Sequence, residues 1–246
     1  MTENTNRVAI VTGGSRGIGR ETAVRLGKDH FDVVVVYSGG KAEAEEAVKD
    51  VEQAGGRAIA VQADVADEHS VNALFDTAER EFGGIDVLVH AAGIMKLSPL
   101  ADLDLSVLDE HLRVNVRGTF VVDQQAARRL RNGGAIVNIS SSLTTLARPN
   151  YSAYAASKAA VNSISLILAR ELRGRDITVN AVGPGPTETA LFMAGKPQEL
   201  IDRMIAEPPL ERLGQPEDIA EIVAFLAGPG RWINGQTIYA NGGSAA

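Results

Sequence analysis

The chain alternates between two kinds of segment, and this alternation constrains its fold more than any other feature. Residues 7–12 form a short run rich in β-branched side chains without polar alternation, which is typical of a strand buried on both faces of a parallel sheet. A stretch with helical spacing follows each such run. Further strand-like runs occupy residues 32–37, 57–62, 85–90, 135–140, 177–182 and 236–239. Helical spacing covers residues 20–29, 41–54, 67–82, 105–131, 150–173 and 216–227, with weaker helical potential at 197–206.

Strands that alternate with helices through a whole chain predict a doubly wound parallel sheet with right-handed crossovers. We therefore expect an α/β fold of the Rossmann type, with about seven strands and helices on both faces. No composition shift marks a domain boundary, so residues 1–246 are predicted to form a single domain. The Gly-Pro-Gly-Pro sequence at 183–186 is expected to form neither helix nor central strand, and we predict a mobile substrate flap near 187–214.

The composition argues against several classes of protein and site. The chain has no cysteine, which excludes disulfides and thiolate sites, and its four histidines lack metal-ligand spacing, so we expect no metal. A formal charge of -7 argues against nucleic-acid and anionic-membrane partners. Residues 1–7 are polar, and no run reaches the roughly 18 apolar residues of a membrane span. We therefore expect no membrane segment and a cytoplasmic location.

A glycine-rich turn, Gly13 to Gly19, lies directly between the first strand and the first helix. A helix N-terminus presents unpaired N–H groups and the positive end of its dipole, and glycines let a diphosphate approach that backbone closely. A lone glycine triplet is weak evidence, and a tight turn without a ligand is the alternative. The position between a buried strand and a helix indicates a dinucleotide site.

Several motifs in the same order resemble the short-chain dehydrogenase/reductase family. Residues 12–19 match the TGxxxGxG fingerprint, 115–118 the NVxG motif, 154–158 the YxxxK motif and 184–189 the PGxxxT segment. The resemblance spans nearly the whole chain and implies the following cofactor-binding residues: Gly13, Ser15, Arg16, Gly17, Ile18, Gly19, Tyr37, Ser38, Asp64, Val65, Ala91, Ala92, Gly93, Tyr154, Lys158, Pro184, Gly185, Thr187 and Thr189.

One position departs from the family pattern. Where the family usually reads NNAG after the fourth strand, this chain has His90-Ala91-Ala92-Gly93. Two side-chain amides that would brace the central sheet are therefore missing. His90 has two interpretations: a titratable group near the nicotinamide, or a buried histidine bonded to backbone, which we favour.

The sequence favours NADP(H) over NAD(H). An NAD enzyme of this architecture usually carries an acid roughly 20 residues past the glycines, and that acid would repel a 2′-phosphate. Here the second strand ends in Tyr37-Ser38-Gly39-Gly40, with no acid at that point. Arg16 and Lys41 are cations that could reach the 2′-phosphate, and Ser38 is a possible donor.

Tyr154 and Lys158 lie four apart on a predicted helix and project from one face. By resemblance, Tyr154 is the general acid, Lys158 binds the nicotinamide ribose and lowers the phenol pKa, Ser141 polarises the carbonyl, and Asn115 holds a water for proton supply. Ser141 is one of three consecutive serines, which makes the choice among them less secure. Tyr151 has no lysine four residues later, so we exclude it as the acid.

The contribution of Lys158 can be estimated. Lowering a phenol pKa from ~10 towards 7 requires roughly 4 kcal/mol. One cation at ~5 Å in an effective dielectric of ~20 supplies about 3 kcal/mol. We therefore expect Lys158 to provide most of the shift.

The predicted substrate region comprises residues 95–103, 143–151 and 187–214. Its apolar side chains suggest a pocket for an acyl chain or ring: Leu97, Leu143, Leu146, Leu191, Phe192 and Met193. The leading interpretation resembles the 3-oxoacyl-acyl-carrier-protein reductases, acting on a small carbonyl or alcohol substrate. Five arginines could meet an acidic carrier protein, although cations at these helix ends also suit the helix dipole: Arg128, Arg129, Arg131, Arg173 and Arg175.

Two alternatives remain open at this point. One is a reductase of polycyclic or hydroxynaphthalene-type ketones, which residues 184–192 and 232–243 also resemble. The other is a catalytically silent NADP-binding sensor, against which the set Asn115, Ser141, Tyr154 and Lys158 argues. The resemblance also implies a homotetramer, with helices 105–131 and 150–173 pairing across one interface and the C-terminal strand across another.

Overall fold

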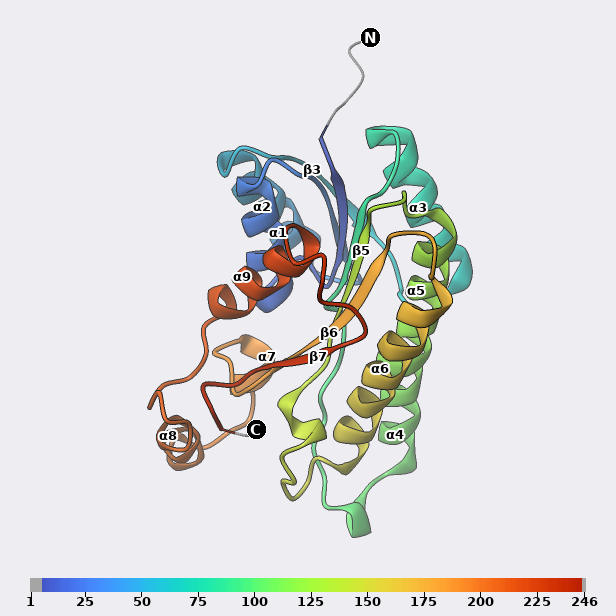
Figure 1. Cartoon of the computed structure of the whole chain (residues 1–246). Helices are drawn as coiled ribbons and strands as arrows, with labels where there is room; N and C mark the ends of the chain where they lie inside the picture. The colour runs from blue at the N-terminus through green and yellow to red at the C-terminus, as the bar shows by residue number, and fades with distance from the viewer. Residues whose placement is uncertain (1–5, 245–246) are drawn as a thin grey trace.

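Seven apolar runs form one parallel sheet in the computed structural model, which describes residues 6–244 (Figure 1). The strand order is β3-β2-β1-β4-β5-β6-β7, so the order reverses between β1 and β4 and opens a crevice at the carboxyl ends of the strands. The predicted fold class is confirmed. The strands are β1 (Val8–Thr12), β2 (Asp32–Tyr37), β3 (Arg57–Gln62), β4 (Val87–His90), β5 (Ala135–Ile139), β6 (Thr178–Pro184) and β7 (Thr237–Ala240).

Helices cover both faces of the sheet. One face carries α1 (Gly17–Lys28), α2 (Lys41–Gln53) and α9 (Pro216–Ala227). The other carries α3 (Glu68–Phe82), α5 (Gly118–Arg129) and α6 (Ser152–Glu171). The remaining helices lie towards the carboxyl ends of the strands, at the bottom of Figure 1: α4 (Leu105–His111), α7 (Ala190–Met193) and α8 (Gln198–Ala206). Short 3₁₀ turns span Leu100–Asp102 and Ser142–Thr144.

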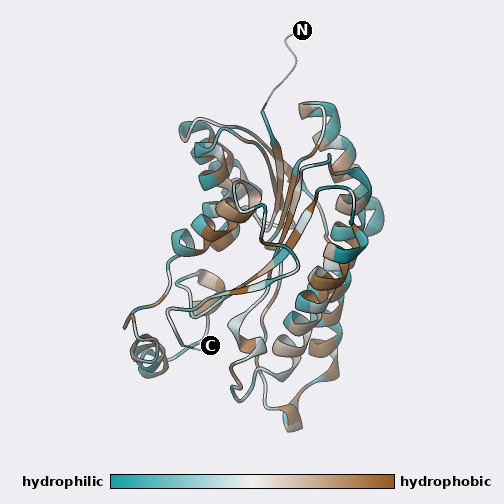
Figure 2. Ribbon diagram, in the orientation of Figure 1, coloured by the Kyte–Doolittle hydropathy of each residue, from teal (hydrophilic) through white to brown (hydrophobic). Residues whose placement is uncertain are grey.

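The first strand shows why its sequence lacks polar alternation. Val8 and Ile10 pack against the α3, α5 and α6 side, whereas Ala9 and Val11 pack against the α1, α2 and α9 side. Successive side chains of a strand point to opposite faces, so a strand covered on both faces must be apolar throughout. The strands are accordingly mostly hydrophobic in Figure 2, while the outward surfaces of α2 and α3 are polar.

The end of β6 contradicts, for Gly183 and Pro184, the prediction that residues 183–186 form neither helix nor central strand. Gly183 and Pro184 continue β6 and pair with Tyr239 and Ala240 of β7. Beyond Val182 the strand has no neighbour in β5, so the missing N–H of Pro184 removes no bond to that side. A β-carbon on Gly183 would lie 2.6 Å from the Tyr239 ring, so the glycine permits this pairing.

The helix predicted at 105–131 is interrupted. After α4 the backbone forms a π-helical turn, Leu112–Arg117, before α5 begins at Gly118. The Thr119 hydroxyl donates to the Asn115 carbonyl at 2.7 Å within this region. The helix also ends earlier than predicted, because Leu130 leaves helical geometry to pack into the core. Single π turns are often found at functional sites.

Smaller differences concern element boundaries, and the one-turn helix α7 was not predicted. Within residues 6–244, no helix is both long and apolar enough to cross a bilayer. The same residues contain no group of three or more side chains placed to hold a metal ion. Of the polar residues 1–7, positions 1–5 lie outside the described residues.

Candidate active site

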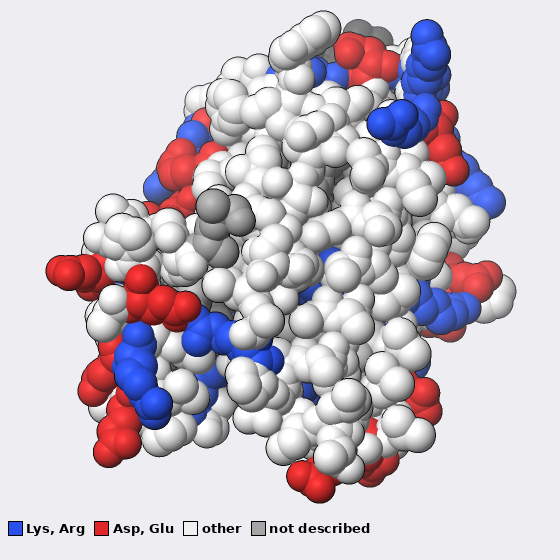
Figure 3. Space-filling model, turned by 60° about the horizontal axis from the view of Figure 1, so that its bottom comes forward, with Lys and Arg blue, Asp and Glu red and all other residues white. Residues whose placement is uncertain are grey.

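A cavity of about 810 Å³ lies at the carboxyl ends of the central strands, on a face where charged side chains are confined largely to the rim (Figure 3). Loops after β1 to β6 contribute to its wall, as the strand reversal requires. All predicted cofactor-binding residues line this cavity, together with Ser141. Of the four residues predicted to be catalytic, Asn115 alone is not among those that line it.

The glycine turn is shaped for a close ligand. Gly13 has φ 66°, and a β-carbon there would lie 2.9 Å from the Ala92 nitrogen. A β-carbon on Gly19 would lie 2.2 Å from the Gly13 oxygen, so neither position accepts a side chain. No side chain caps α1, which leaves its first N–H groups facing the cavity for a diphosphate. The residues present therefore fit a dinucleotide.

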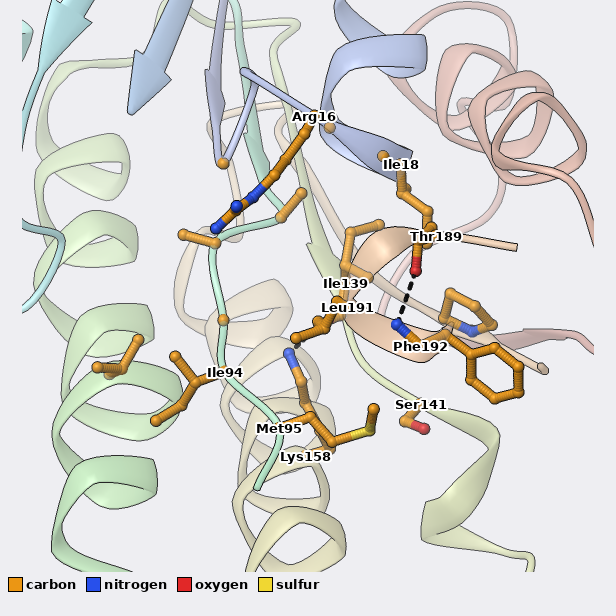
Figure 4. Close-up of a pocket in the computed structure, with 18 of the residues that line it drawn as sticks. Arg16, Ile18, Ile94, Met95, Ile139, Ser141, Lys158, Thr189, Leu191 and Phe192 are labelled. Carbon is orange, nitrogen blue, oxygen red and sulfur yellow. Dashed lines mark hydrogen bonds between the residues drawn. The ribbon is translucent and has the colours of Figure 1, made fainter. Parts of the chain in front are cut away.

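At the end of the cavity next to β2, Arg16 and Ser38 line the wall and are exposed. Arg16 extends from the start of α1 into the cavity (Figure 4), and no carboxylate of the described residues lies within ion-pair distance of it. The prediction for Lys41 is wrong. Lys41 does not line the cavity, and its Nζ lies 3.5 Å from Glu45 Oε1 on the outer surface of α2.

A charged pair missed by the sequence analysis lies in the cavity wall after β3. Arg113, from the π turn, forms an ion pair with Asp64, which follows β3. Asp64 also accepts a hydrogen bond from the Ala66 N–H at 2.9 Å. Desolvation acts to raise the pKa of Asp64, but the bonds to Arg113 and Ala66 outweigh it and lower that pKa. Asp64 is therefore held as a carboxylate that can accept hydrogen bonds.

Ser141, Tyr154 and Lys158 converge on one wall of the cavity (Figure 4 shows Ser141 and Lys158). Ser141 caps a 3₁₀ turn after β5, and its Oγ accepts from the Leu143 N–H at 3.2 Å. Tyr154 and Lys158 are one turn apart on α6. Lys158 is buried, and its Nζ donates to the Ile139 carbonyl at 2.7 Å. A serine hydroxyl, a phenol and an ammonium thus face the same space.

The pKa values of Tyr154 and Lys158 differ from the expectation. Burial raises the pKa of Tyr154 to about 12, although a hydrogen bond with Ser141 lowers it in part. Burial also lowers the pKa of Lys158 to about 8. The estimate that Lys158 does most of the work in acidifying the phenol is therefore wrong for the protein alone. The estimate counted the attraction of the cation and omitted the desolvation of the phenolate.

Asn115 lies behind the cavity wall. It is 1% exposed, its Oδ1 accepts from the Ile94 N–H at 2.9 Å, and its Nδ2 donates to the Ile94 carbonyl at 3.0 Å. Nδ2 also donates to Ser157 Oγ at 3.0 Å. The side chain thus fixes the loop after β4 against α6. That Asn115 also holds a water for proton supply stays a prediction.

His90 is a structural residue. It is 3% exposed within β4, and its Nδ1 lies 2.7 Å from Thr12 Oγ1. Burial lowers the pKa of His90 to about 3, and the charge of Lys158 adds to this effect, so the ring is neutral near pH 7. The favoured interpretation, a buried histidine bonded to backbone, is confirmed for the burial of His90. It is wrong for the bonding partner, which is the side-chain hydroxyl of Thr12. This bond braces β1 against β4.

The substrate end of the cavity is only partly as predicted. Leu143, Leu146, Leu191 and Phe192 line it, whereas Leu97 and Met193 do not. Arg148, Tyr151 and Met204 also line it, and all three lie within the predicted substrate region.

The five arginines considered for a carrier protein lie away from the cavity. Arg131 bonds to Ile85 and Asp86, which precede β4, and Arg175 bonds to the Leu130 carbonyl, which precedes β5. Both arginines therefore lie at the amino-terminal edge of the sheet. Arg129 pairs with Asp76 and Glu79 of α3. None of the five lines the cavity, so they do not form a docking surface at its mouth.

Comparisons with known proteins agree with this geometry. The family model described as enoyl-(acyl carrier protein) reductase matches residues 13–245. A short-chain type dehydrogenase/reductase of Picea abies is 45% identical, over 96% of this chain and 92% of its own length. The NADPH-dependent aldehyde reductase 2 of Arabidopsis thaliana is 44% identical, over 96% of this chain and 93% of its own length. A 3-oxoacyl-[acyl-carrier-protein] reductase of Staphylococcus aureus is 40% identical, over 96% of each chain.

Solved structures match the whole chain. A short chain dehydrogenase from Burkholderia cenocepacia in complex with NADP superposes with a TM-score of 0.93 at 42% identity, covering 100% of both chains. A blue fluorescent protein from a metagenomic library in complex with NADPH gives a TM-score of 0.92 at 40% identity, covering 99% of this chain and 100% of that one.

Proposed function

The chain belongs to the short-chain dehydrogenase/reductase family, and from this premise we propose an NADP(H)-dependent oxidoreductase that reduces a ketone to a secondary alcohol. The observation that carries the proposal is the convergence of Ser141, Tyr154 and Lys158 beside an uncapped helix start and glycine turn. NADP-bound relatives and the exposed Arg16 support the choice of cofactor.

The residues of the chain supply binding, orientation and a proton. When bound, NADPH supplies a hydride to the carbonyl carbon. Ser141 donates a hydrogen bond to the carbonyl oxygen, and Tyr154 Oη transfers its proton to the oxygen as negative charge develops there. Lys158, charged at neutral pH, stabilises the phenolate that remains. With a pKa of about 12, the phenol keeps its proton near pH 7, which is the form that reduction needs.

The substrate proposed is a 3-oxoacyl thioester. Leu143, Leu146, Leu191 and Phe192 provide an apolar wall for an acyl chain. The relative named 3-oxoacyl-[acyl-carrier-protein] reductase supports this choice, while the placement of the arginines favours a thioester that is not presented by a carrier protein. A small aldehyde is the second candidate, supported by the relative named NADPH-dependent aldehyde reductase.

We propose that the enzyme is a homotetramer in the cytoplasm. Large apolar side chains remain exposed on the outer faces of the helical layer: Leu112, Phe120, Leu166 and Ile167. Trp232 is fully exposed before β7, and Phe225 of α9 is half exposed. Exposed large apolar side chains of this kind are typical of subunit interfaces.

The proposal is tested by comparing the two tyrosines of the cavity. Tyr154→Phe should lower kcat by about 10² to 10⁴-fold, while Tyr151→Phe should keep kcat within about tenfold. NADPH oxidation is measured with a β-ketothioester, an aromatic diketone and an aldehyde, and NADPH binding by fluorescence. Retained kcat in Tyr154→Phe would refute the acid role. Binding without turnover across the whole panel would favour a sensor.

A further inference from the structure

His111 lies directly behind the cavity wall at the end of α4 and is 0% exposed. Its Nδ1 is 2.7 Å from the Val107 carbonyl, and its Nε2 is 3.2 Å from the Lys96 nitrogen. A carbonyl can only accept and a backbone N–H can only donate. The ring therefore carries its hydrogen on Nδ1 and uses the Nε2 lone pair to hold Lys96, which defines one neutral tautomer.

The same ring contacts the tyrosine proposed as the acid. The His111 and Tyr154 ring centroids are 6.2 Å apart, and the rings meet edge to face at 69°. This is a favourable arrangement for two aromatic rings. One side of His111 thus holds the loop after β4, and another packs against the phenol ring on α6.

Asn115 repeats this connection one helical turn later. It bonds to Ile94 in the loop and to Ser157 on α6, three residues after Tyr154. His111 and Asn115 are therefore two parallel ties between the same loop and the same helix. Between their attachment points, Ile94 and Met95 form part of the cavity wall (Figure 4).

A third connection between the loop and α4 is at the surface. Lys96 forms an ion pair with Glu110, and both side chains are about half exposed. Exposed pairs of this kind contribute little free energy. The bond from the Lys96 N–H to His111 is part-buried and ends on a ring that is 0% exposed, and leaving a donor unpaired away from water is costly.

We propose that His111 is a positioning residue that couples the loop of residues 94–96 to Tyr154. With the loop seated, the His111 ring is held against the phenol and keeps Tyr154 Oη directed at the carbonyl oxygen. This inference rests on the proposed function, in which Tyr154 is the proton donor. A small displacement of a reacting group lowers the rate strongly, so loss of this support acts mainly on kcat.

Two substitutions of similar polarity distinguish loss of the hydrogen bond between the Lys96 N–H and residue 111 from general damage to the fold. In His111→Gln the side-chain oxygen can reach the position of Nε2 and accept from Lys96. In His111→Asn the amide reaches only the position of Nδ1, so the Lys96 N–H loses its acceptor. Both variants lose the ring contact with Tyr154. Any difference between them therefore reports the bond to the loop.

Because both variants lose the ring contact with Tyr154, we expect kcat of each to be about tenfold lower than that of wild type, with less change in KM. The Lys96 amide should exchange with deuterium about tenfold faster in the Asn variant. Lys96→Ala, which removes the ion pair but keeps the N–H, is the control and should leave kcat within about twofold.

Equal deuterium exchange of the Lys96 amide in the two variants would refute the role of His111 in holding the loop through this hydrogen bond. A wild-type kcat in both variants would overturn the coupling of His111 to Tyr154. Failure of the proposed function is distinguishable, because it would appear as a wild-type protein without turnover or as an active Tyr154→Phe variant. The exchange measurement needs no substrate and reads out the tie in every case.

Discussion

Arg16 shows how one residue can select a cofactor. It stands at the N-cap of α1 with its side chain in the cavity, and no carboxylate follows β2 that would repel a 2′-phosphate. Lys41, the other cation predicted for this role, is held on the surface by Glu45. We therefore propose that Arg16 and Ser38 make the phosphate contact.

Arg16→Ala should raise the KM for NADPH about tenfold and leave the KM for NADH within about twofold. Lys41→Ala, with a similar loss of positive charge nearby, should change neither value. Initial rates with both cofactors provide the measurement. An equal effect of Arg16→Ala on the two cofactors would contradict the assignment.

Asp123 is a buried acid without a cation. It is 2% exposed on α5, and its Oδ2 accepts from Asn138 Nδ2 at 2.8 Å. Asp123 Oδ1 and Asn138 Oδ1 have no hydrogen-bond partner among the described residues. Burial raises the pKa of Asp123 to about 7, with the Asn138 bond opposing the shift.

This raised pKa makes stability depend on pH. The folded chain keeps a proton that the unfolded chain releases near pKa 3.8, so stability should fall as pH rises from about 4 to 7. Asp123→Asn removes the charge and supplies an N–H for Asn138 Oδ1, so its Tm should exceed that of wild type at about pH 8 and approach it at about pH 5. Asp109→Asn, at an exposed position, is the control. Parallel Tm curves for wild type and Asp123→Asn would exclude this assignment.

At the scale of elements, the segment 187–214 is closed at its base. The Glu188 N–H donates to the Gly214 carbonyl, and the Gly214 N–H donates to the Pro186 carbonyl, both at 2.9 Å. The segment has its own small apolar cluster, built on Ile201, Met204 and Leu213 and separate from the two clusters of the sheet. We therefore propose that it moves as one flap.

One ion pair connects this flap to the opposite wall of the cavity. Arg148, which precedes the catalytic helix, pairs with Glu207 at the end of α8. Their side chains are 21% and 35% exposed, so the pair is partly shielded from water. We expect it to hold the flap over bound substrate.

Glu207→Gln should raise the KM for the carbonyl substrate by about three- to tenfold and leave NADPH affinity unchanged. Arg203→Ala, on the exposed face of α8, is the matched control and should behave as wild type. Steady-state kinetics at low and high salt provide the test, since screening should raise the wild-type KM towards that of the variant. A wild-type KM that does not change with salt would argue that the ion pair between Arg148 and Glu207 does not hold the flap over the substrate.

At the scale of the whole molecule, the apolar side chains on the outer faces of α5 and α6 distinguish this helical layer. Phe120 and Ile167 are 58% and 55% exposed, although each lies on a helix whose other face is buried in the core. A partner subunit would remove this surface from water, and each side chain would contribute up to about 2 kcal/mol.

Phe120→Glu and Ile167→Glu together should therefore shift the protein from tetramer to smaller species. Light scattering at micromolar concentration measures the mass, and circular dichroism checks that the subunit remains folded. Gln124→Glu, at an exposed polar position of α5, is the control. A wild-type monomer under these conditions would contradict the tetramer.

The sequence was sufficient for the parts of this protein that depend on local spacing. Burial on both faces of each strand, the glycine turn, and the four-residue interval between Tyr154 and Lys158 follow from the geometry of strands and helices, whose repeat lengths are properties of the backbone. The order of these units then predicts the sheet and the edge at which the site forms.

Only the tertiary structure decided which charged side chains reach the cavity, and what pKa values the groups there have. Arg148 meets Glu207, Arg113 meets Asp64, and His111 meets Lys96 across intervals that no local pattern encodes. The high pKa of Tyr154 likewise follows from surrounding protein that excludes water. Ion pairing and desolvation depend on distances between residues far apart in the chain, and those distances are set only when the elements pack together.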